Sequence, residues 1–177
     1  MLSWLRTRAD RRERATDLYG VVVARAREPV FYATLDIPDT PEGRYEMVAM
    51  HLVLVLERLR AEGAAGIGLS RDLIEAFVAD MDGSMREMGV GDLSVPKKVK
   101  SAAAGLYGRA EAFRAGMAAD APPRALEAAI TRLTLGREDG ADDARAAPFA
   151  RYYRATWGAL AEVPPGEALA GRIDFPA

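Results

Sequence analysis

The sequence predicts an all-α fold, a single-domain bundle of about six helices around one central apolar helix. Alanine is the commonest residue, and β-branched and aromatic residues are sparse, a composition that favours helix over strand. Apolar residues recur at helical spacing, and the 177 residues suit one domain with one hydrophobic core. We expect residues 1–163 to form the helical domain and residues 164–177 to form a non-helical tail.

The first predicted helix covers residues 3–28. Ser3 is a suitable N-cap, and Pro29 cannot continue a helix, so these two residues mark its ends. Leu18 and Val22 belong to an apolar stripe at helical spacing. One face of this helix should therefore be buried.

The second predicted helix is the central one. Thr40 and Pro41 supply an N-cap and a first-turn proline after an aromatic-rich connector at residues 31–38, and the helical pattern continues to Glu62. Its middle, residues 47–56 with the sequence MVAMHLVLVL, is apolar on every face. That pattern is typical of a helix that is surrounded by others.

Four further helices are predicted after the glycine-rich segment GAAGIG, residues 63–68, which should end the central helix. The starts of these helices are expected at Ser70, Ser94, Asp120 and Pro148. The polar segment at residues 136–144 should separate the last two.

The composition excludes several classes of function. The chain has no cysteine, which removes disulfides and thiolate chemistry, and His51 is its single histidine, which removes a multi-histidine metal site. A formal net charge of -2 gives no overall basic field, so we expect no DNA partner. We expect no cofactor and no catalytic activity. The N-terminus lacks the apolar core of a secretory signal, so we expect a cytoplasmic protein that begins at Met1.

Several residues could carry chemistry, and each has a plainer explanation. His51 could be a general base or a haem ligand, but its apolar surroundings favour a buried histidine that is hydrogen-bonded in the core. The segment GAAGIG resembles a phosphate-binding loop, yet it follows a helix and lacks the Gly-Lys-Ser/Thr ending. The carboxylates between Glu138 and Asp143 could bind Mg²⁺ or Ca²⁺, although a solvated acidic turn is the simpler interpretation.

The N-terminal residues could contact a membrane. Leu2, Trp4 and Leu5 are apolar, and arginines at positions 6, 8, 11, 12 and 14 follow them. Such a helix could lie on an anionic bilayer, with its arginines on the headgroups. Asp10 and Glu13 weaken the basic field, which favours a solvated helix start.

The segment from Asp80 to Lys100, DMDGSMREMGVGDLSVPKKVK, is the best candidate for a binding surface. It holds all three lysines of an arginine-rich chain together with methionines, whose side chains adapt to irregular apolar partners. Lysines at a helix N-terminus oppose the helix dipole, and this cost suggests an acidic partner. We expect a methionine-bearing groove beside a basic edge. The expected contact residues are Met81, Arg86, Met88, Val90, Asp92, Lys97, Lys98 and Lys100. A methionine stripe facing the core beside a solvated basic turn remains the alternative.

The same segment, with residues 18–48 and 51–60, resembles the ubiquinol–cytochrome c chaperone family, the assembly factors of the respiratory cytochrome bc1 complex. The similarity is strongest over residues 18–115. It implies an all-helical chaperone-type domain over residues 1–163 that binds newly made cytochrome b. The heavy use of alanine, arginine and glycine, with Asp10 and Glu13 near the N-terminus, favours a bacterial member, which we expect to dock at the cytoplasmic face of the inner membrane. Contact with the ribosome is known for mitochondrial relatives. Against the family pattern, Ala102, Ala103 and Ala104 leave their helix smooth where bulkier residues could pack.

Other functions stay open at this point. A helical enzyme of the isoprenoid or phospholipid type would use Mg²⁺ held by acidic motifs on two facing helices, and no second motif answers the acidic segment near Asp139. An RNA-associated or ribosome-associated helical protein would act through the lysine cluster, and its binding would depend on salt.

Overall fold

The computed structural model describes residues 2–137 and 143–176, with side chains from residue 7 onward. Within these residues the chain forms helices and no strand, so the all-α prediction is confirmed. The helices are α1 (Leu2–Ala26), α2 (Pro29–Ala33), α3 (Pro41–Arg60), α4 (Ala64–Glu87), α5 (Val95–Met117), α6 (Ala125–Leu133), α7 (Ala146–Ala161) and α8 (Pro165–Leu169). The predicted main helices correspond to the six longer elements. The short helices α2 and α8 are additional.

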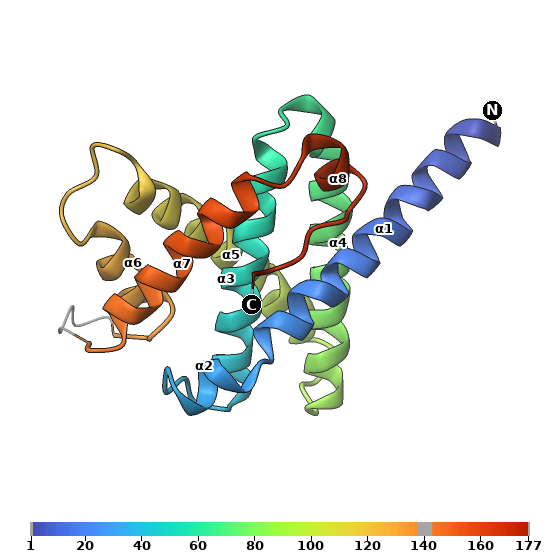
Figure 1. Ribbon diagram of the computed structural model, residues 1–177. Coiled ribbons are helices and arrows are strands. Elements are labelled where there is room, and N and C mark those ends of the chain that lie inside the picture. The colour runs from blue at the N-terminus through green and yellow to red at the C-terminus, as the bar shows by residue number, and fades with distance from the viewer. Residues whose placement is uncertain (1, 138–142, 177) are drawn as a thin grey trace.

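Helix α3 lies at the centre of the bundle (Figure 1). The Thr40 side chain caps it by accepting a hydrogen bond from the Gly43 amide at 3.2 Å. Its apolar run is buried from Met47 to Val55, and Leu52 and Val55 are fully inaccessible to solvent, whereas Leu56 is partly buried. Helices α1, α4, α5, α7 and α8 all pack against it. The prediction of a central apolar helix is therefore confirmed.

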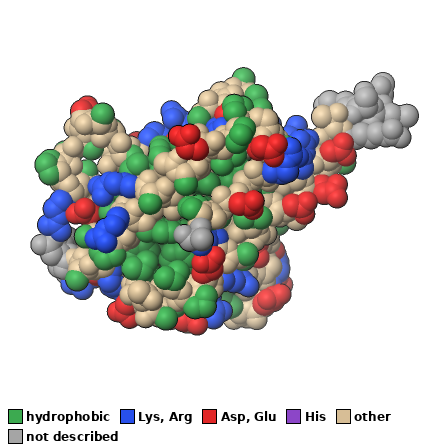
Figure 2. All heavy atoms as spheres, in the orientation of Figure 1, with side chains coloured by type: hydrophobic (Ala, Val, Ile, Leu, Met, Phe, Trp, Pro, Cys, Tyr) green, Lys and Arg blue, Asp and Glu red, His purple; other side chains and the backbone are tan. Residues whose placement is uncertain are grey.

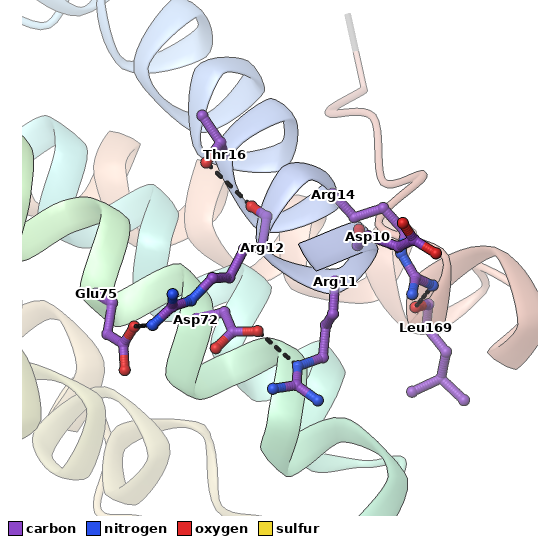
Figure 3. Close-up of polar contacts among 8 residues, drawn as sticks. All are labelled: Asp10, Arg11, Arg12, Arg14, Thr16, Asp72, Glu75 and Leu169. Atoms are coloured by element: carbon purple, nitrogen blue, oxygen red, sulfur yellow. Dashed lines mark hydrogen bonds and ion pairs between the residues drawn. The ribbon is translucent and has the colours of Figure 1, made fainter. Parts of the chain in front are cut away.

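Helix α1 packs along α4 over most of its length, while its N-terminal end extends beyond the other helices (Figure 1). Two ion pairs join these helices, Arg11 to the buried Asp72 at 2.5 Å and the exposed Arg12 to Glu75 at 3.2 Å (Figure 3). Further along the interface, the Tyr19 hydroxyl donates a hydrogen bond to Asp80 at 2.8 Å. Helix α4 is thus held firmly from the side that faces α1.

Helix α4 begins earlier than predicted. The glycine-rich segment at residues 63–68 was expected as a loop with Ser70 as the cap, but only Gly63, with φ +58°, forms the turn. Gly66 lies inside α4 because α3 and α4 approach each other closely there. A Cβ atom on Gly66 would lie 2.0 Å from the Leu59 carbonyl oxygen. The superficial resemblance of this segment to a phosphate-binding loop has no structural counterpart, because most of the segment is helical.

The C-terminal residues are packed and partly helical, which corrects the expected non-helical tail at residues 164–177. Pro165 occupies the first turn of α8, where a proline is readily accommodated. Ala168 and Ile173 are buried in the core. The chain leading to α8 is held by the Arg58 guanidinium, which donates to the Val163 carbonyl oxygen at 2.6 Å. Arg14 reaches the Leu169 carbonyl oxygen at 3.4 Å (Figure 3).

Candidate functional site

An apolar groove of about 1190 Å³ runs between α4 and α5, and the C-terminal part of α3 contributes to its lining. The lining residues are Leu56, Glu57, Arg60, Gly63, Ala64, Ile67, Ser70, Arg71, Ile74, Glu75, Val78, Ala79, Asp82, Pro96, Val99, Lys100, Ala103, Tyr107 and Ala110. A second cavity of about 750 Å³ lies between α5 and α6 and has arginines in its lining. The α4–α5 groove is larger, and apolar side chains dominate it.

The two walls of the groove follow from helical periodicity. On α4, Ile67, Ile74 and Val78 recur at intervals of seven and four residues and so share one face. On α5, Val99 and Tyr107 lie two turns apart on the facing side. Ile67 is 57% exposed and Tyr107 is 60% exposed, high values for residues of this size. The groove is therefore an exposed apolar surface rather than part of the packed core.

Small side chains on α5 create the space in the groove. Ala103 lies in its lining between Lys100 and Tyr107, and Ala110 follows Tyr107 on the same wall. Ala104, the next residue along, is exposed outside the groove. The run of alanines that departs from the expected packing in the sequence thus has a structural counterpart, because a bulky residue at position 103 would fill the groove.

The acidic residues of the groove are neutralised by arginines. Glu57 is buried and accepts hydrogen bonds from the Arg114 guanidinium, including one from Nε at 3.1 Å, and this bond raises the pKa of Arg114. Glu75 pairs with Arg12 at 3.2 Å, and Asp82 accepts a hydrogen bond from Arg86 at 2.7 Å. The carboxylates along the groove therefore present little free negative charge.

Unlike the acidic residues of the groove, two of its basic residues form no ion pair among the described residues. Arg71 on α4 and Lys100 on α5 are exposed and line opposite walls. Across residues 2–137 and 143–176, no ion pair is recorded for either of them. An occupant that carries carboxylates beside an apolar surface would match this arrangement.

The residues expected to bind a partner gather at one end of the groove. Lys100 is the one that lines it, near Asp82 and Pro96. Met81 is half-buried and packs against the core, whereas Met88 is 55% exposed. The others are Arg86, Val90, Asp92, Lys97 and Lys98, which lie around the connection between α4 and α5.

The expected methionine-bearing groove is not what the structure contains. Aliphatic side chains and Tyr107 line the groove, and no methionine is among the lining residues described. The sequence reasoning missed Ile67, Ile74, Val78 and Tyr107. These residues are ordinary members of amphipathic helices, and the spacing on one helix alone cannot separate a groove from a core face.

His51 is a buried core residue, as predicted. It is fully inaccessible, and its Nδ1 lies 2.7 Å from the Met47 carbonyl oxygen while Nε2 lies 2.6 Å from the Tyr152 hydroxyl. Burial lowers the pKa of the imidazole to about 4, so the ring is neutral at physiological pH. His51 is not among the residues that line the groove.

Other predicted sites fall partly outside the described residues. Glu138, Asp139 and Asp142 lie outside them, and so do the side chains of Leu2, Trp4 and Leu5. Asp143 is bound by Arg145, which lowers the pKa of this carboxyl to about 2. In the part of the chain that the structure describes, no group of three potential metal ligands occurs, and none of the helices has the length and hydropathy of a membrane span.

Comparison with known proteins identifies the family. The family model described as ubiquinol–cytochrome c chaperone matches residues 33–175, which include both walls of the groove. A curated relative from Xenopus laevis, ubiquinol-cytochrome-c reductase complex assembly factor 1, is 24% identical over 131 residues. The match covers 74% of this chain and 64% of the relative, so the chain spans less than two thirds of that relative's length.

A solved structure agrees with this result. The crystal structure of the Cbp3 homolog from Brucella abortus matches with a TM-score of 0.84 and 36% sequence identity. The match covers 99% of this chain and 96% of that chain. The resemblance inferred from residues 18–115 is confirmed and extends over the whole helical bundle. The chain belongs to the ubiquinol–cytochrome c chaperone family.

Proposed function

We propose that this protein is an assembly chaperone of the cytochrome bc1 complex, and that its α4–α5 groove holds an apolar segment of newly made cytochrome b. The observation that carries the proposal is the exposed apolar groove, with Ile67 and Tyr107 largely accessible on its opposite walls. An unassembled membrane subunit has apolar surface that its haem and partner subunits later cover. A groove of this kind would shield such surface by binding alone, with no bond chemistry.

The size and shape of the groove favour a polypeptide over a small molecule. Its volume of about 1190 Å³ exceeds the range of about 300–1,000 Å³ that is common for small-molecule sites. Its walls are two helix faces, each with apolar residues spaced by whole turns. An amphipathic or apolar helix laid into a groove between helices is a common mode of peptide recognition.

The charges at the groove select the kind of segment. The acidic groups are paired with arginines, whereas Arg71 and Lys100 have no ion pair among the described residues. We infer that the bound segment carries acidic residues beside its apolar face. Such pairing across an interface adds specificity and register more than affinity.

The other predicted contact residues belong to the end of the groove. None of Met81, Arg86, Met88, Val90, Asp92, Lys97 and Lys98 lines it, and most lie where α4 turns into α5. We propose that they border the point at which the client segment leaves the groove. The chaperone would act at the cytoplasmic face of the inner membrane, where a newly made membrane protein is inserted.

Site-specific photo-crosslinking tests the proposal. A photoreactive residue would replace Val99 inside the groove or, as the matched control on the same helix, Ala104 outside it. Each variant would be expressed in cells that make cytochrome b, and the adducts would be identified by mass spectrometry. Crosslinks to cytochrome b from position 99 and few from position 104 are expected. Equal crosslinking from both positions, or an adduct with other proteins in place of cytochrome b, would refute the assignment.

A further inference from the structure

The end of α4, the connection that follows it and the first turn of α5 have an unusual surface, and we refer to these residues, 86–98, as the α4–α5 tip. Leu93 is 99% exposed, and Met88, at the end of α4, is 55% exposed. A leucine with almost no protein contact loses the benefit of burial in the folded chain. Two large apolar side chains displayed on one connection therefore point to a surface that is covered by something else.

Hydrogen bonds and a buried side chain hold the backbone of the α4–α5 tip in place, so Leu93 is held in an exposed position. Val95, two residues later, is fully buried and anchors the start of α5. The Ser94 amide donates to the Gly91 carbonyl oxygen at 2.8 Å, and the Val90 amide donates to Met85 at 3.0 Å. The Arg86 guanidinium binds the Asp92 carboxylate and so closes the loop across its base.

Two lysines follow the exposed leucine on the first turn of α5. Lys97 and Lys98 occupy the first turn of α5 and are exposed, and no ion pair is recorded for either of them within the described residues. Of the acidic groups of the tip, Asp92 is bound by Arg86, and Glu87 is exposed. Lysines in the first turn of a helix oppose its dipole. Their position is unfavourable within the chain itself and favourable toward an external anion.

We propose that the α4–α5 tip docks on an anionic lipid bilayer, with Leu93 inserted at the level of the acyl chains and Lys97 and Lys98 on the phosphates. The combination of one protruding apolar residue and flexible flanking lysines suits an interface, because lysine side chains reach headgroups while apolar groups enter the boundary region. The inner leaflet facing the cytoplasm is negatively charged, which attracts such lysines. A folded protein partner would need a pocket for the protruding Leu93, whereas a bilayer accepts a convex tip.

This placement deepens the proposed function, on which its biological meaning rests. Pro96 belongs to both the groove lining and the α4–α5 tip, and Asp82 in the lining is close to the tip in sequence, so one end of the groove would face the bilayer. A client segment could pass between membrane and groove over a short distance. Binding to lipid itself, however, depends only on the residues of the tip.

Vesicle flotation with the full chain tests the inference. The probe is vesicles of equal parts phosphatidylcholine and phosphatidylglycerol, compared with vesicles of phosphatidylcholine alone. We expect binding to the anionic vesicles that weakens with salt. Leu93→Ser should weaken it about ten-fold. The double variant Lys97→Gln with Lys98→Gln should weaken it about five-fold for each lysine removed.

Matched controls separate the tip from the groove. Ile67→Ser changes an exposed apolar residue inside the groove, and Arg151→Gln removes an exposed cation from α7; both should bind vesicles like the parent chain. All variants should keep the parent melting temperature, because the replaced side chains are exposed. The proposal is overturned if the parent chain ignores anionic vesicles, or if Leu93→Ser binds them as well as Ile67→Ser does. Lysine-dependent binding to ribosomes without any Leu93 effect would also overturn it and would assign the tip to RNA.

The crosslinking experiment on the groove and the flotation experiment can fail separately. Loss of cytochrome b crosslinks at position 99 with intact vesicle binding would remove the client assignment and leave the lipid surface. Crosslinking that persists in a chain without vesicle affinity would do the reverse.

Discussion

The hydroxyl of Tyr152 on α7 lies 2.6 Å from Nε2 of His51 on α3, and this hydrogen bond joins two helices inside the core. The Met47 carbonyl oxygen beside Nδ1 can only accept, so the neutral imidazole carries its proton on Nδ1, and Nε2 accepts from the Tyr152 hydroxyl, to which Arg25 Nε donates at 3.2 Å. The Nδ1–H of His51 then donates to the Met47 carbonyl oxygen at 2.7 Å. This assignment fixes the tautomer of the histidine and connects α1, α3 and α7 through one chain of polar groups.

Tyr152→Phe should lower the free energy of unfolding by about 1–3 kcal/mol, because it leaves the buried Nε2 of His51 without a partner. Arg25 would lose a hydrogen bond at the same time. The exposed Tyr107 gives a matched control, and Tyr107→Phe should stay within about 0.5 kcal/mol of the parent chain. Urea denaturation followed by circular dichroism measures both. Equal stability of the two variants would show that the hydrogen bond contributes nothing.

The free energy of unfolding should decrease as the pH is lowered from about 6.5 to about 4, because of His51. The folded chain holds the pKa of this histidine at about 4, below its ordinary value of 6.5, so in this window the unfolded chain binds a proton that the folded chain does not. Lower pH therefore favours unfolding, and the contribution of His51 is fully present above pH 6.5. The loss attributable to His51 approaches about 3 kcal/mol near pH 4. Carboxylates also titrate there, so the comparison is with His51→Gln, whose pH profile should be flatter. Parallel profiles would contradict the prediction.

Ala103→Trp should block client capture without unfolding the chain, because position 103 lies in the open groove and has room for a larger residue. Ala104→Trp places the same side chain one residue away, outside the groove, and should capture the client normally. Recovery of cytochrome b with affinity-tagged chaperone measures the difference, and we expect a loss of about ten-fold or more at position 103 alone. If both variants recover cytochrome b equally, the client does not occupy this groove.

Val55→Asp should unfold the protein at neutral pH. Val55 is fully buried in α3, and an unpaired carboxylate at that position costs several kcal/mol, a large part of the stability of a domain of this size. Ala65→Asp, on the exposed first turn of α4, should melt close to the parent temperature. Thermal melts of both variants provide the comparison. A cooperative transition for Val55→Asp at the parent temperature would mean that α3 is not central.

Arg114→Ala should destabilise the chain by about 2–3 kcal/mol, because it leaves the buried carboxylate of Glu57 without its main partner. Arg114 donates to this carboxylate through Nε and Nη2, whereas Arg60 lies 3.7 Å from it and is largely exposed. Arg60→Ala should therefore cost less than about 1 kcal/mol. Chemical denaturation of the two variants distinguishes them, and a larger effect at position 60 would reverse the assignment.

The main helices could be predicted because their signals are local. Thr40 and Pro41 mark the start of α3 by cap chemistry, and the run at residues 47–56 is apolar on every face, which few other arrangements explain. The start of α4 was placed wrongly for a physical reason. A glycine such as Gly66 usually suggests a turn. Here it lets the backbones of α3 and α4 approach each other at Leu59, and this packing between helices cannot be recognised from the local sequence.

The groove could be anticipated only in part. The lysine cluster directed attention to residues 80–100, and Lys100 does line the groove. The apolar wall was missed because a residue such as Ile74 follows the same periodicity whether its helix face is covered or open. The packing of α4 against α5 decides whether that helix face is covered or open. The alanines at positions 102–104 were the available signal, since small residues where bulky ones could pack leave space between helices.

The attachment of α4 to α1 has a consequence for client release. Arg11 and Tyr19 hold α4 on the side that faces α1, through Asp72 and Asp80, and Arg12 pairs with Glu75 at the edge of the groove. Because α1 supports α4, this wall of the groove would keep its position when the client leaves, and the empty groove would stay open for the next client. The client would transfer when a later assembly partner competes for the same apolar stretch.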